Sequence, residues 1–269
     1  MDISSKFRLG AIALAISTLM ASPSFAQGEG GGAAPSFTPQ SGWWANPNQP
    51  GGRSVLIETN AEGGIFASML AFDDTQRSVW YVIDTRNVNG GQVGELQQFV
   101  GGQSLNGPYR EGKFLGFFET ASFFFTSPTT GTINLAGQSM EIQRQDIVAN
   151  GVAMGPQAGA PRSGWWWSPE ENGRGYFIEA QGDNMLFAGL MYDDLGQATW
   201  YSASGTMITP TLFSAQLIQP YGGQTLNGPY TTPSQGFDEG SMTIQFTSDT
   251  TATLTIPSGR QIPLLRYTF

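Results

Sequence analysis

Two glutamates stand at matching places in this 269-residue chain and are the first candidates for chemistry. Glu58 and Glu179 each end a short apolar run that begins just after an arginine. An enzyme that cleaves a glycosidic bond uses two carboxylates, one on each side of it. If this chain is a polysaccharide hydrolase, we expect Glu179 to act together with Asp193 or Asp194.

The same glutamates have a simpler explanation as partners of arginine. If residues 175–179 form a strand, Phe177 and Glu179 share a face, which puts a carboxylate beside an apolar surface. A carboxylate in such a place needs a partner or a raised pKa. The candidate partners precede these strands or lie near the last strand of each half: Arg53, Arg174, Arg144 and Arg266. We therefore favour ion pairs and expect no catalytic residue.

A run of tryptophans gives the most distinctive candidate for binding. Successive side chains of a strand point to opposite faces, so Trp165 and Trp167 share one face and Trp166 takes the other. One face belongs to the core, and the tryptophans outside it can stack on a sugar ring or another flat ligand. Alternatively, the rings close the end of a barrel or cover its rim. The ligand-binding residues predicted here are Trp43, Trp44, Trp165, Trp167, Arg174 and Tyr176.

Two Asp-Asp pairs raise the question of a calcium site, because Ca²⁺ takes several carboxylate and carbonyl oxygens. They are Asp73 with Asp74, and Asp193 with Asp194. Each pair lies between two apolar runs, where Asp and Gly supply the geometry of a hairpin turn. The spacing of an EF-hand loop is absent. We favour turns over metal binding at both pairs and expect no cofactor.

The sequence contains neither histidine nor cysteine, which excludes several classes of function. There can be no disulfide framework, thiol nucleophile, Ser-His-Asp triad, or zinc or haem held by histidine. Two Gly-Gly-Gln segments (101–109 and 222–230) do not fit a phosphate loop either, because neither a lysine nor an expected helix follows them.

The first 26 residues have the pattern of a secretory signal peptide: Lys6 and Arg8, an apolar run, then small residues before a cleavage point near Ala26. We expect a flexible Gly- and Pro-rich leader at 27–40 and a secreted protein, periplasmic or extracellular. No later segment reaches the ~20 apolar residues of a membrane-spanning helix.

The charge balance argues against nucleic acid as a partner. The whole chain has 21 acidic and 12 basic residues. Removing residues 1–26 takes away one acid and two bases, which leaves 20 and 10 and a net charge of −10. A phosphate backbone would be repelled by this charge at long range.

The elements that must position these residues come in two copies. Four motifs of residues 41–147 return in the same order in residues 163–269, joined by a Gly- and Pro-rich linker at 148–162. They are Ser-Gly-Trp-Trp, Gly-Arg followed by an apolar run ending in Ile-Glu, Asp-Asp followed by Trp-Tyr, and Gly-Gly-Gln-x-Leu-Asn-Gly-Pro-Tyr. The chain is therefore a tandem repeat.

Short alternating runs rich in Val, Ile, Thr and aromatic residues, separated by turn residues, predict an all-β fold. Each repeat holds about eight such runs. Short connections imply antiparallel neighbours, so each repeat is an eight-stranded meander that closes into a barrel or stays open as a two-sheet sandwich. We favour two barrels.

The four motifs together resemble a repeat module of secreted proteins of Gram-negative bacteria. The resemblance covers residues 41–146 and 163–269 and implies secretion without indicating an activity. Repeat one departs from the pattern at Ala45, where repeat two has Trp167, and at Ser54, where repeat two has Gly175. The Gly-x-Trp opening also distantly resembles the start of lipocalin- and avidin-like barrels.

These observations predict a secreted, non-catalytic binding protein that recognises a glycan or another extracellular polymer through aromatic residues. Two linked modules raise avidity without new contacts. Three alternatives stay open: a polysaccharide hydrolase, a carrier of a small apolar ligand inside each barrel, and a structural module of the envelope or matrix. The sequence leaves the oligomeric state undetermined.

Overall fold

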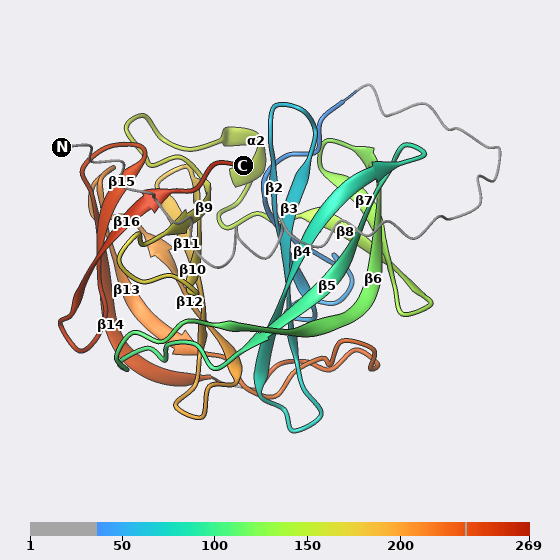
Figure 1. The fold of residues 1–269 in the computed structure, drawn as a ribbon. Coiled ribbons are helices and arrows are strands. Elements are labelled where there is room, and N and C mark those ends of the chain that lie inside the picture. Colours follow the sequence, from blue (N-terminus) through green and yellow to red (C-terminus); the bar gives the residue numbers. More distant parts are fainter. Residues whose placement is uncertain (1–36, 235) are drawn as a thin grey trace, which may run out of the picture.

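Two closed antiparallel β-barrels stand side by side in the computed structural model (Figure 1). The structure describes residues 37–234 and 236–269. The predicted all-β fold, with two tandem modules of eight strands and barrels rather than sandwiches, is confirmed. The predicted signal peptide and residues 27–36 of the leader lie outside the described residues. No helix in the described part of the chain is long and apolar enough to cross a membrane.

Barrel 1 is a meander in which each strand pairs with the next and the last pairs with the first. Its strands are β1 (Gly42–Ala45), β2 (Ser54–Thr59), β3 (Ile65–Phe72), β4 (Ser78–Val88), β5 (Gly91–Val100), β6 (Lys113–Ser127), β7 (Thr130–Leu135) and β8 (Gln138–Arg144).

Barrel 2 repeats the same order and is closed by pairing between its first and last strands. Its strands are β9 (Gly164–Trp167), β10 (Gly175–Gln181), β11 (Asn184–Tyr192), β12 (Ala198–Thr206), β13 (Leu212–Gln219), β14 (Phe237–Phe246), β15 (Thr251–Thr255) and β16 (Gln261–Arg266).

The segment between the barrels is anchored to barrel 2. It contains the one-turn helix α2 (Gly151–Met154). The backbone N–H of Gly182 donates to the carbonyl of Gly155, and the N–H of Gln157 donates to the carbonyl of Gly182. Backbone groups of the Gly- and Pro-rich linker, residues 148–162, therefore pair with the β10–β11 turn.

Large side chains fill the interior of each barrel. In barrel 2, Tyr176 and Ile178 of β10 point inward and pack with Phe187, Phe213 and other buried residues. Tyr176 and Phe187 stack with ring centroids 5.9 Å apart. An eight-stranded barrel is just wide enough for such side chains to fill it, so these interiors are protein cores.

The strands that face the neighbouring barrel are buried on both sides. All eight residues of β3 and all seven of β10 are buried. Strands β2, β3 and β4 of barrel 1 lie against β10, β11 and β12 of barrel 2 (Figure 1). A side chain that points out of one barrel, such as Phe177, therefore enters a core shared with Trp165, Leu56 and Phe66. Burial of both faces explains why the apolar runs here are nearly continuous.

Each barrel also sends its Gly-Gly-Gln loop (101–109 or 222–230) onto the other barrel. Leu105 of the first loop is buried in the core of barrel 2, and Leu226 of the second is buried in the core of barrel 1. Matching backbone bonds hold the loops: Gly101 N–H donates to Gly196 O over 2.7 Å, and Gly222 N–H donates to Gln76 O over 2.8 Å. The exchange is reciprocal.

The second glycine of each loop lies directly beneath an aromatic ring. A Cβ at Gly102 would come within 2.1 Å of the Tyr192 ring, and one at Gly223 within 2.3 Å of the Phe72 ring. Any side chain would push the ring away, so this close approach of loop and neighbouring barrel requires glycine.

Candidate functional site

The two candidate glutamates bridge the barrels. Glu179 of barrel 2 forms an ion pair with Arg144 of barrel 1, and both side chains are almost fully buried. Its carboxylate also accepts hydrogen bonds from the Trp43 N–H at 2.6 Å and from Gln181 Nε2 at 2.6 Å. The ion pair that the sequence favoured is present, with an arginine of the other repeat.

Glu58 makes the corresponding contacts in the opposite direction. It pairs with Arg266 of barrel 2, and its Oε2 accepts a hydrogen bond from the Trp165 N–H at 2.7 Å. A Cβ at Gly164 would collide with both Arg266 and Glu58, so the Gly-Trp motif leaves room for the pair. Buried charges need partners of this kind.

The carboxylates proposed for hydrolysis are not brought together. Glu179 pairs across the sheet with Leu186, and Asp193 follows Tyr192 at the other end of the same strand. Seven positions separate Leu186 from Asp193, which at about 3.3 Å each places the backbones of Glu179 and Asp193 more than about 20 Å apart. A glycosidase needs its pair within ~5–10 Å. This geometry does not support a catalytic pair.

The predicted ligand-binding residues lie mostly between or inside the barrels. Trp44 is in the core of barrel 1 and Tyr176 in that of barrel 2, while Trp165 packs edge-to-face on Phe177 at 5.0 Å. Arg174 is buried, pairs with Glu171 and donates to the carbonyls of Ser104 and Leu105.

Trp43 and Trp167 are only half-buried. Of the predicted aromatic set, these two retain surface that a ligand could reach. Binding of a glycan by them stays a prediction.

Both Asp-Asp pairs lie in hairpin turns. Asp73 Oδ1 accepts hydrogen bonds from the N–H groups of Thr75 and Arg77 at 2.8 and 3.0 Å. Asp193 Oδ1 accepts one from the Gln197 N–H at 2.8 Å. Within residues 37–234 and 236–269, no three acidic side chains are grouped as a metal site would require. Asp74 and Asp194 therefore belong to no such group either.

A pocket opens where these two hairpins meet. It has a volume of about 200 Å³ and takes walls from both barrels. Barrel 1 supplies the turn before β4, and barrel 2 supplies the β11–β12 turn and the facing ends of β12, β13 and β14. Its lining residues are Arg77, Ser78, Asp193, Gln197, Ala198, Thr199, Gln219, Pro220, Tyr221 and Phe237.

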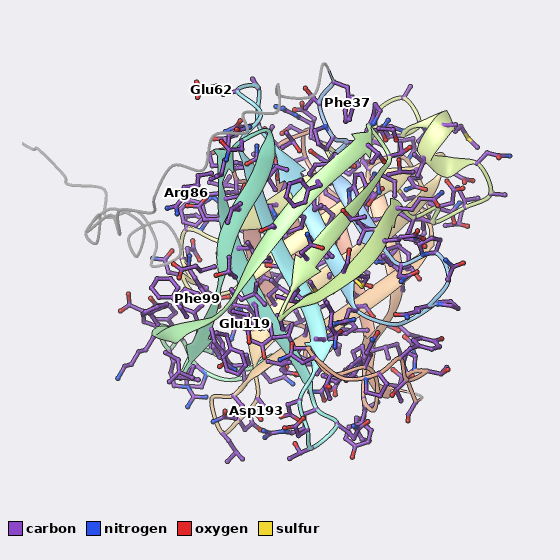
Figure 2. All side chains as sticks on the ribbon, turned by 90° about the vertical axis from the view of Figure 1, so that its right-hand side faces the viewer. Phe37, Glu62, Arg86, Phe99, Glu119 and Asp193 are labelled. Carbon is purple, nitrogen blue, oxygen red and sulfur yellow. The ribbon has the colours of Figure 1, made fainter. Side chains whose placement is uncertain are left out.

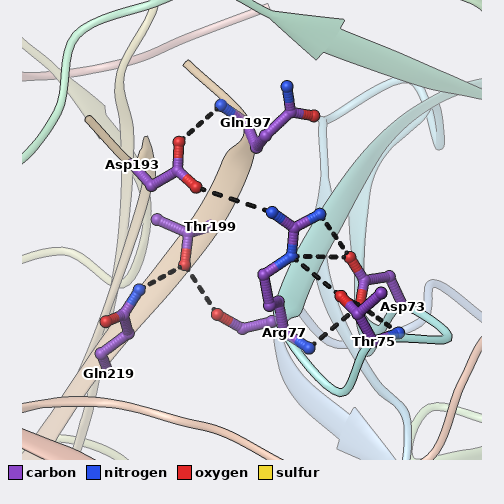
Figure 3. Close-up of polar contacts among 8 residues, drawn as sticks. Asp73, Thr75, Arg77, Asp193, Gln197, Thr199 and Gln219 are labelled. Carbon is purple, nitrogen blue, oxygen red and sulfur yellow. Dashed lines mark hydrogen bonds and ion pairs between the residues drawn. The ribbon is translucent and has the colours of Figure 1, made fainter. Parts of the chain in front are cut away.

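A polar network forms one wall of this pocket (Figure 3). Arg77 forms a 2.9 Å ion pair with Asp73, and its Nη1 lies 4.0 Å from Asp193 Oδ2. Thr199 Oγ1 lies 2.7 Å from the hydroxyl of Ser78. The network thus joins the two barrels at the pocket.

Two amide groups in this wall have spare hydrogen-bonding capacity. Gln219 Nε2 donates to Thr199 Oγ1 over 2.9 Å. In the described part of the chain, neither the side-chain amide of Gln197 nor Oε1 of Gln219 forms a hydrogen bond. A bound ligand could therefore use a donor and acceptors that the fold leaves free.

The pKa of Asp73 reflects this network. Burial alone would raise the pKa of its carboxyl group, but hydrogen bonds from Thr75 and Arg77 outweigh that effect, and the pKa is lowered. The carboxylate stays charged and fixes the Arg77 guanidinium at the pocket.

Two aromatic rings form another part of the pocket wall. Tyr221 and Phe237 meet edge-to-face with ring centroids 5.8 Å apart. They are 38% and 58% exposed, so their outer faces are open to solvent. A ligand in the pocket would meet both polar groups and apolar ring faces.

The two repeats differ at this pocket. By their place in the matching strands, Thr199 corresponds to Val79 and Tyr221 to Val100, and Arg77 corresponds to Gln197. The pocket therefore takes Thr199 and Tyr221 where barrel 1 has valines, and it takes both Arg77 and Gln197. Sequence reasoning missed the pocket because it followed the residues that the repeats share, whereas Thr199 and Tyr221 are among those in which the repeats differ.

Comparisons with known proteins add no information about function, which has to be inferred from the geometry of the site. No protein-family model, curated protein or solved structure matches the chain.

Proposed function

We propose that this protein is a non-catalytic glycan-binding protein whose site is the pocket between the two hairpins. The observation that carries the proposal is the pairing of an open aromatic wall, Tyr221 and Phe237, with a polar wall of Arg77, Asp193 and Gln219 in one small cavity. We further propose that it acts outside the cytoplasm, on the basis of the predicted signal peptide.

The chemistry of a sugar ring suits these two walls. Its C–H face is apolar and packs on an aromatic ring, while its hydroxyls both donate and accept hydrogen bonds. The Gln197 and Gln219 amides can do both, and the Arg77 guanidinium donates in a fixed plane. The volume of about 200 Å³ is below the ~300–1,000 Å³ of drug-sized ligand sites and suits one ring of a longer chain.

The charge of the protein narrows the class of glycan. Residues 27–269 carry a net charge of −10, which repels a polyanionic polymer at long range. Arg77 is moreover balanced by Asp73 and Asp193. A neutral glycan is therefore the ligand we propose.

Binding is favoured over hydrolysis by the position of the carboxylates. Among the described residues, Asp193 is the one carboxylate that lines the pocket, and Glu179 is enclosed between the barrels by Arg144 and Trp43. A site with one carboxylate and no second one across from it can hold a sugar but lacks the acid–base pair that cleaves it.

The test is calorimetric titration of residues 27–269 with neutral bacterial and plant oligosaccharides. We expect saturable binding that weakens about tenfold in Gln219→Ala and in Tyr221→Val, the latter taking the residue that barrel 1 has at this place. The matched control is Gln98→Ala, the counterpart of Gln219 in barrel 1, which should bind normally.

Two results would count against the site. Normal binding in both pocket variants, with loss in Trp167→Ala, would move the site to the half-buried tryptophans. Absence of saturable binding with every neutral glycan, in a protein that remains folded, would overturn the proposal itself.

A further inference from the structure

The first half of β6 exposes an apolar surface that barrel 2 lacks. Phe114, Leu115, Phe117 and Phe118 are between 45% and 59% exposed. Register shifts against β5 let Phe114 and Phe117 pack on each other with ring centroids 5.1 Å apart, whereas Phe118 packs on Tyr81 at 5.4 Å, so the set extends over both faces of the strand. Figure 2 faces this side of barrel 1, with Glu119 of β6 and Phe99 of β5 labelled. Contiguous exposed apolar side chains of this kind mark an interaction surface.

The same half of the strand also has a free edge. On one side β6 pairs with β5 from Lys113 onward, but on the other side it pairs with β7 only from Ala121. Among the described residues, no hydrogen bond reaches the outer backbone groups of residues 113–120. Such an edge is a template for pairing with another strand.

Barrel 2 protects the equivalent edge. By its place in the meander, β14 corresponds to β6, and it begins with Phe237 followed by Asp238, Glu239 and Gly240. Charged residues on an edge strand prevent association with other strands. The two acids of barrel 2 stand where barrel 1 has Phe117 and Phe118, so this edge of barrel 1 has apolar side chains where that of barrel 2 has charges.

We propose that this edge pairs with the same edge of a second copy of the chain and makes a two-fold symmetric dimer. Antiparallel pairing centred on Gly116 brings the end of the segment that carries Lys113 close to the end that carries Glu119 in the other copy. The exposed apolar residues lie between these two ends, where β6 has register shifts against β5, and they meet across the two-fold axis. The segment is therefore complementary to itself in charge and in apolar contact, as a two-fold interface requires.

A second strand suits this surface better than a flat partner. Exposed side chains on both faces are covered together when a sheet is extended at its edge, whereas a partner packed on one face leaves the other exposed. An anionic lipid surface is disfavoured because residues 27–269 carry a net charge of −10 and two glutamates, Glu111 and Glu119, flank the apolar residues.

Variants of the two charged residues test the proposal, with the oligomeric state measured by sedimentation velocity over a range of protein concentrations. Residues 27–269 should dimerise, and Lys113→Glu and Glu119→Lys should each weaken the dimer on the order of tenfold, because each puts like charges opposite each other twice. Mixing the two single variants should restore dimers, since every facing pair is then opposite in charge.

A second set of variants tests the apolar contacts. Phe117→Asp combined with Phe118→Glu, which copies barrel 2, should give a monomer with an unchanged circular dichroism spectrum. Arg86→Glu, an exposed charge change on β4, is the control and should dimerise normally.

Three outcomes would overturn the proposal: a monomer at all concentrations, a dimer that persists in Phe117→Asp/Phe118→Glu, or a monomer that binds neutral or anionic phospholipid vesicles through Phe117. Glycan binding at the pocket uses other residues, so the monomeric variant Phe117→Asp/Phe118→Glu should still bind glycan in the calorimetric titration. The two proposals can therefore fail independently of each other.

Discussion

The surface between the barrels and the surface around the pocket differ in how they use the two repeats. Between the barrels the main buried contacts occur twice: Glu58 mirrors Glu179, Leu105 mirrors Leu226, and Trp80 Nε1 donates to Met191 O as Trp200 Nε1 donates to Ala71 O. At the pocket the repeats differ, with Thr199 and Tyr221 in barrel 2 where barrel 1 has Val79 and Val100.

This contrast explains what the repeated motifs do. Each barrel must both supply a loop and receive one, and both supply a glutamate and accept one, so the same residues are needed in each copy. The shared motifs thus specify the docking of the barrels. Residues in which the copies differ are free of that requirement, and they include Thr199 and Tyr221 at the pocket and Phe117 and Phe118 at the β6 edge.

The largest effect is expected from the buried ion pairs. Glu179→Ala leaves Arg144 charged and unpaired between the barrels, which should lower the free energy of unfolding by about 3–5 kcal/mol in urea denaturation. Glu58→Ala should cost nearly as much because its contacts match. Glu62→Ala, on the exposed β2–β3 turn, is the control and should change little. Equal stability of Glu179→Ala and Glu62→Ala would mean that the pair contributes nothing.

The loop leucines should show the next largest effect. Leu105→Ala and Leu226→Ala each leave a cavity in the core of the opposite barrel, and each should cost about 2–4 kcal/mol in thermal or urea unfolding. The same change at Leu195, which is 82% exposed, serves as the control. A loss confined to one of the two loop variants would show that the barrels do not depend on each other equally.

The smallest effect concerns the hairpin at the pocket. The lowered pKa of Asp73 means that its stabilisation is present above the carboxyl group's ordinary pKa and is lost as the pH falls through the folded-state value. The Asp73→Asn variant should therefore be less stable than the parent by at most about 1 kcal/mol at pH 7, because the ion pair is partly exposed. In strong acid this difference in the free energy of unfolding should disappear. Urea unfolding measured from pH 7 to pH 2 checks this, and an unchanged difference between variant and parent at all pH values would contradict it.

Much of the fold could be predicted because it is encoded locally. Alternating apolar residues and turn residues mark the strands, and short connections imply a meander. The sequence also indicated that Glu58 and Glu179 are more easily explained by arginine partners than by catalysis. It could not indicate that these arginines belong to the other repeat, because strand patterns carry no information about the partner that covers an outward face.

The pocket was beyond sequence reasoning for a related reason. Arg77 and Thr199 are far apart in the chain and come together only because the barrels dock with their hairpins adjacent. Nor does the pattern of Trp165 distinguish a sugar platform from an interface, since both require an aromatic side chain that points out of its own barrel.

The sequence by itself determined the two modules, their strand order and the chemistry that they exclude, because composition, spacing and repetition are properties of the chain. The tertiary structure alone decided which outward faces become core, which loop enters which barrel, and where polar and aromatic groups of both repeats meet. Those features depend on the burial of two matching surfaces against each other, and burial arises only when the barrels are placed side by side.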